Sequence, residues 1–78
     1  MRLVAQIPHP SCRISILSWN GKFFLKFEMV QMEQTFKASE SDTGDLESFK
    51  AKITTHFIDL VLSSFQQLDE EFSLLLES

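Results

Sequence analysis

The stretch that decides the fold is CRISILSWNGKFFLKFE, residues 12–28, in which apolar and polar residues alternate on both sides of Asn20-Gly21. A period of two places successive side chains on opposite faces of a strand. Asn and Gly readily adopt the two positive-φ positions of a type I′ turn, which joins the strands of a hairpin. We therefore expect antiparallel strands over about 12–19 and 22–29.

A two-residue turn sets the register of this hairpin, because each residue of one strand then faces a defined residue of the other. The predicted pairs are Trp19 with Lys22, Leu17 with Phe24, Ile14 with Phe27 and Arg13 with Glu28. One face then carries five apolar side chains and is the expected core face: Ile14, Ile16, Phe23, Leu25 and Phe27.

Two further strands are expected to flank the hairpin. LVAQI, residues 3–7, precedes it and is ended by PHPS, in which Pro8 and Pro10 lack backbone donors. After Phe27 the apolar positions change parity, so one residue must be added before the chain continues in the sheet.

The added residue comes either from a second tight turn near Met29-Val30 or from a β-bulge that bends one long strand. The turn would pair Phe27 with Met32, Lys26 with Glu33 and Phe23 with Phe36. We favour the turn, since it gives one opposite-charge pair and two apolar pairs. It predicts a fourth strand over about 31–38.

Residues 45–78 contain no Gly or Pro, and from Leu46 the apolar period becomes that of a helix. SESDTGD, residues 39–45, ends the sheet and offers helix N-caps. One helix over about 44–76, packed on one face of the sheet, is therefore expected. Its core stripe is predicted to be Leu46, Phe49, Ile53, Phe57, Leu60, Ser64, Leu68 and Leu75.

A second apolar edge runs along the same helix: Ile58, Leu62, Phe65, Phe72 and Leu76. One stripe is enough to cover a sheet of short strands, and a helix of roughly 45 Å overhangs strands of about 25 Å. The second edge is therefore a candidate self-association surface that packs on a second subunit. The alternative is a kink near Gln66–Glu71 that folds the last turns back onto the same core.

Charge divides the chain in two. Residues 1–37 carry five basic and two acidic residues, whereas residues 38–78 carry two basic and nine acidic residues, for net charges of +3 and −7. Basic and apolar side chains share the outward face of the hairpin, which is a candidate ligand surface: Arg13, Leu17, Trp19, Lys22, Phe24, Lys26 and Lys37. Such a face is suited to stacking on bases and neutralising phosphates. The overall charge of −4 and the neighbouring Glu28 and Glu33 make nucleic acid the less favoured partner.

No pattern indicates a catalytic or metal site. The sequence contains no Walker loop, GxGxxG, HExxH or GxSxG motif and no Cys/His group with zinc-site spacing. Cys12 follows His9 by three residues, but a cysteine at the start of a strand is typically a small buried hydrophobe. We therefore expect no catalytic residue, metal or cofactor. No apolar run approaches the roughly 18 residues that span a bilayer, so a soluble cytoplasmic protein is expected.

IPHPSCRISILSWNGKFFLKFE, residues 7–28, followed by MEQTFK, residues 32–37, resembles a small family of short bacterial proteins with no assigned function. The resemblance covers most of the chain. It implies a free-standing cytoplasmic domain and transfers no catalytic residue.

These patterns together predict one α+β domain over residues 1–78, an antiparallel meander of three or four strands followed by one long C-terminal helix. The predicted role is a protein-interaction or assembly module that acts as a homodimer or with another protein. Nucleic-acid or anionic-ligand binding through the outward sheet face is the alternative.

Overall fold

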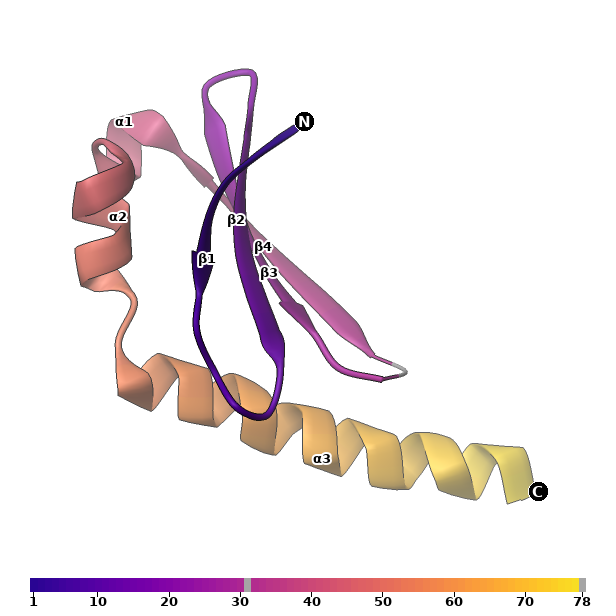
Figure 1. Ribbon diagram of the computed structural model, residues 1–78. Coiled ribbons are helices and arrows are strands. Elements are labelled where there is room, and N and C mark those ends of the chain that lie inside the picture. Colours follow the sequence, from indigo (N-terminus) through magenta and orange to yellow (C-terminus); the bar gives the residue numbers. More distant parts are fainter. Residues whose placement is uncertain (31, 78) are drawn as a thin grey trace.

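A computed structural model describes residues 1–30 and 32–77 and contains four strands followed by three helices. The strands are β1 (Arg2–Ile7), β2 (Arg13–Trp19), β3 (Lys22–Glu28) and β4 (Glu33–Ser39). The helices are α1 (Glu40–Thr43), α2 (Leu46–Lys52) and α3 (Thr55–Glu77). The strands form one antiparallel sheet in the order β1-β2-β3-β4 (Figure 1). The predicted α+β meander with a long C-terminal helix is confirmed.

The β2–β3 hairpin has the predicted turn and register. Asn20 and Gly21 have φ values of 54° and 74°, the two positive values that a type I′ turn requires. The predicted pairs are all present: Trp19 with Lys22, Leu17 with Phe24, Ile14 with Phe27 and Arg13 with Glu28.

The β3–β4 connection is a turn, as predicted, but its register is shifted by two residues. The N–H of Met29 donates to the carbonyl of Met32 at 2.8 Å, and the reverse bond measures 3.4 Å, so Met29 closes the turn instead of lying in it. Phe27 therefore pairs with Gln34 and not with Met32. Side chains alternate between the two faces of a strand, so a shift of two residues leaves each side chain on its predicted face, and Phe36 stays on the core side. The strand expected over 31–38 begins at Glu33, and Gln31 lies outside the described residues.

The helix expected over about 44–76 is divided in the structure. Ile53 ends α2 in an extended conformation (φ −81°, ψ 109°), and the side-chain oxygen of Thr54 accepts a hydrogen bond from the N–H of Phe57 at 3.1 Å. Thr54 therefore caps α3. β-Branched residues form helices less readily than straight-chain ones, and Thr favours caps, so this run can end a helix without Gly or Pro. α3 is continuous to Glu77, and the alternative of a kink near Gln66–Glu71 is wrong.

The core lies between the sheet and one side of α3. The five predicted sheet residues are buried, and α3 adds Ile58, Val61 and Phe65. Phe49 of α2 stacks on Phe23 with a centroid distance of 5.3 Å. The predicted helix stripe is not maintained in α3, since Leu60, Leu68 and Leu75 are exposed. Because the chain leaves the helix at residues 53–54, the rotational phase of α3 is independent of the phase of α2.

Candidate interaction surfaces

The outward face of the sheet carries all seven residues of the predicted ligand surface. The cross-strand register places Leu17, Phe24 and Lys37 in one row across β2, β3 and β4, with Trp19 and Lys22 in the next row. The helices pack on the opposite face, against the buried core residues. Trp19 is 54% exposed, whereas Leu17 and Phe24 are half-buried. The sequence therefore identified a real cluster, which is part apolar and part basic.

Charges on this face are only partly available. The Nζ atom of Lys26 lies 3.8 Å from a carboxylate oxygen of Glu28 and 3.6 Å from one of Glu33. Lys26 is thus largely neutralised by its own neighbours. Within residues 1–30 and 32–77, the other cations of this surface form no salt bridge: Arg13, Lys22 and Lys37. Leu3, which faces Leu17 from β1 and is exposed, extends the apolar row and was not anticipated.

The predicted self-association edge of the helix is mostly core. Ile58 and Phe65 are only 8% and 3% exposed, and Leu62 is half-buried against the same chain. Ile58 and Phe65 are therefore core residues of the same chain because of the phase of α3, and Leu62 is only partly accessible. Phe72 and Leu76, the other two members, are exposed.

Two parts of α3 are exposed to solvent, its C-terminal half and a strip along the side toward β4. All residues from Gln66 to Glu77 are exposed, and this half of the helix extends beyond the sheet (Figure 1). In the first half, Leu60 is exposed on the side toward β4, and Leu68 continues that side one turn past Ser64. Residues four apart lie one above the other on a helix, so Leu60, Ser64 and Leu68 form a continuous strip.

A groove of about 320 Å³ separates this strip from the edge strand β4. Its apolar wall includes Phe36, which is 37% exposed and lies 5.2 Å from Phe57 between ring centroids. The full lining is Gln34, Phe36, Phe57, Leu60, Val61, Ser64, Phe65 and Leu68. The sequence predicted Leu60 and Leu68 to be core. The β-branched run at residues 53–55 was the signal that the helix could change phase before them.

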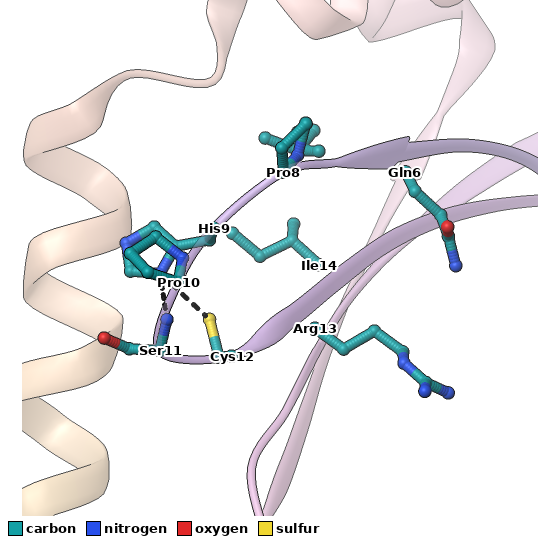
Figure 2. A pocket seen from close by; sticks show the side chains of 9 residues that line it. Gln6, Pro8, His9, Pro10, Ser11, Cys12, Arg13 and Ile14 are labelled. Atoms are coloured by element: carbon teal, nitrogen blue, oxygen red, sulfur yellow. Dashed lines mark hydrogen bonds between the residues drawn. The ribbon is translucent and has the colours of Figure 1, made fainter.

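The β1–β2 loop forms a separate open pocket of about 770 Å³ around His9 and Cys12 (Figure 2). The Nδ1 atom of His9 accepts a hydrogen bond from the N–H of Ser11 at 3.1 Å and lies 3.9 Å from the Sγ atom of Cys12. Burial raises the pKa of the Cys12 thiol above its usual value. The thiol form is therefore favoured at neutral pH, and the His9 nitrogen nearest to it already has a donor. A nucleophilic Cys–His pair is characterised by a lowered thiol pKa, whereas the pKa of Cys12 is raised.

Metal sites and membrane spans are not found in the described ranges. Residues 1–30 and 32–77 contain no group of three or more His, Cys, Asp and Glu side chains that could hold a metal ion. In the same part of the chain, no helix combines the length and the apolar character needed to cross a bilayer. No protein-family model, no curated protein and no solved structure matches this chain.

Proposed function

We propose that this chain is a small cytoplasmic interaction module that self-associates as a homodimer. The observation that carries the proposal is the exposed strip of Leu60 and Leu68 beside the groove at β4, each side chain being 53% exposed. Contiguous apolar surface that borders a groove is typical of contact sites, whereas isolated exposed leucines are common on any protein.

The size of the domain supports association. A chain of 78 residues buries a smaller share of its surface than a larger domain does, and small domains often complete their cores through a second subunit. Complete burial of a fully exposed leucine contributes about 1.5–3 kcal/mol, and Leu60 and Leu68, each 53% exposed, can add about half of that. A symmetric dimer would bury both leucines of each copy, so the free energy of burial would be gained once from each strip.

The mass in solution tests the proposal. Light scattering over a concentration series should give twice the monomer mass of 9.0 kDa for the unmodified protein at high micromolar concentration. Leu68→Ser should shift the protein to the monomer mass. Leu3→Ser is a matched control, because Leu3 is also 53% exposed but lies on the outward face of β1, away from the groove. A monomer mass for the unmodified protein at every concentration would refute self-association.

A second candidate function rests on the outward sheet face. The exposed indole of Trp19 lies beside Lys22, with Lys37 in the next row, and neither cation is paired within the described residues. Stacking of one base on such a ring contributes about 1–3 kcal/mol, and binding to phosphates weakens steeply with salt.

Titration of Trp19 fluorescence with single-stranded oligonucleotides at low salt tests this second candidate. Trp19→Ala should weaken binding of a labelled oligonucleotide by roughly 5- to 150-fold. Lys37→Glu should weaken it more than Lys26→Glu, since Lys26 is already paired with two carboxylates. An unchanged signal at low salt would eliminate nucleic acid as a ligand.

A further inference from the structure

The two edges of the sheet differ in how well they resist the addition of another strand. β1 is interrupted by a register shift between Leu3 and Ala5, and Pro8 follows its last residue. Bulges and prolines are common devices that protect an edge. β4 keeps an unbroken register with β3 along all seven residues and contains no proline. The edge of β4 therefore has neither a bulge nor a proline, and of these protective devices it carries only the charged side chains of Glu33 and Lys37 (Figure 1).

The hydrogen-bond alternation of the sheet identifies the backbone groups that β4 presents at this edge. Met29 and Met32 form a hydrogen-bonded pair at one end of β4, and the N–H of Glu40 donates to the carbonyl of Gly21 at the other end. Hydrogen-bonded pairs recur at every second residue of an antiparallel ladder. The even-numbered residues of β4 therefore bond to β3, and Glu33, Thr35 and Lys37 direct their N–H and C=O groups outward.

We propose that β4 pairs antiparallel with β4 of a second copy of this chain, around a two-fold axis at Thr35. Thr35 then faces Thr35 of the other copy, and Glu33 of each copy faces Lys37 of the other. The inference rests on the proposed self-association and names the surface through which it occurs. The three facing pairs would form about six backbone hydrogen bonds, two for each pair.

Charge selects this register over its neighbours. Centring the two-fold axis on Lys37 would oppose two lysines, and centring it on Glu33 would oppose two glutamates, both of which are unfavourable across adjacent strands. Centring it on Thr35 gives two opposite-charge pairs. Within one chain, Lys37 forms no salt bridge in the described residues, and Glu33 shares Lys26 with Glu28, so both side chains can serve the interface.

The groove beside β4 supports the same arrangement. It lies on the core side of this edge and is walled by Phe36 and by the strip of Leu60, Ser64 and Leu68. A two-fold axis at the edge would bring the grooves of both copies together on one face of a continuous sheet. Because Ser64 is small and lies between the leucines, two strips could approach in antiparallel orientation with each leucine beside the other copy's groove.

Charge-swapped variants test the pairing in solution. Glu33→Lys and Lys37→Glu should each weaken dimerisation at least tenfold, because each variant places like charges opposite each other at both ends of the strand pair. A one-to-one mixture should dimerise at wild-type strength, since one chain then carries lysine and the other glutamate at both facing positions. Lys22→Glu is the matched control, because Lys22 lies on the same face in the interior strand β3. Far-UV circular dichroism checks that each variant folds.

A backbone variant gives a second, independent readout. Thr35→Pro removes an outward N–H group that β3 does not use and should dissociate the dimer, whereas Thr35→Val keeps that group and should leave the dimer intact. A mixture of the two charge variants that associates no more tightly than either alone would overturn the inference. If the unmodified protein is dimeric and Leu68→Ser dissociates it while the β4 variants do not, strand pairing fails and self-association stands. A monomeric unmodified protein refutes both.

Discussion

Replacing Phe27 by Ala should remove a large part of the stability of this domain. Phe27 is fully buried, and its ring contacts Phe36 and Phe57 in edge-to-face geometry, with centroids 6.0 and 6.1 Å away. Truncation of a buried Phe to Ala costs about 3–5 kcal/mol. A domain of 78 residues has a free energy of unfolding of roughly 4–12 kcal/mol. The variant should therefore lose between a quarter and all of its free energy of unfolding.

Urea denaturation followed by far-UV circular dichroism at low protein concentration measures the change. Phe27→Leu provides a folded second variant: it keeps most of the volume, loses both aromatic contacts and should cost about 1–3 kcal/mol. Phe72→Ala is the control, since the same residue type is exposed there and its removal should change the monomer by less than about 0.5 kcal/mol. Equal losses for Phe27→Ala and Phe72→Ala would show that Phe27 does not occupy the core.

Three further predictions concern the turn, a helix cap and the thiol. Gly21→Ala should lower the free energy of unfolding by about 1–2 kcal/mol, measured by urea denaturation. The loss comes from backbone strain alone, because φ is +74° and a Cβ atom would meet nothing within 4 Å. An unchanged urea midpoint would contradict the type I′ turn. The backbone N–H of Ser48 donates to Asp45 at 2.9 Å and lowers the pKa of that carboxyl. The ionised Asp45 carboxylate therefore stabilises the folded protein above the unfolded pKa of about 4, and this stabilisation is lost as the pH falls. The difference in free energy of unfolding between the wild type and Asp45→Asn should accordingly shrink from about pH 5 to about pH 3. Cys12, whose pKa is raised by burial, should react with a disulfide reagent at neutral pH more slowly than free cysteine; rapid labelling with a midpoint near pH 7 would instead indicate an activated thiolate.

The residues that share the outward face of the sheet could be predicted one by one, and the residues exposed on α3 could not. Asn20-Gly21 specifies a turn, the turn specifies a register, and the register decides that Trp19, Phe24 and Lys37 share one face. No comparable chain of local rules exists for α3. Ile58 and Leu60 are equally apolar in sequence, but one is buried and the other exposed because Thr54 restarts the helix in a new phase.

Local sequence rules account for the first hairpin, its five core residues and the helical character of the C-terminal third. They also favoured a turn after Phe27, but with a register two residues away from the observed one. Alternation and turn chemistry act over a few residues, so they can be read without knowing what lies nearby. Which side of α3 faces the sheet, and the position of β4 as an open edge strand, are seen only in the folded protein. Those outcomes depend on packing between segments far apart in the chain, which no local pattern encodes.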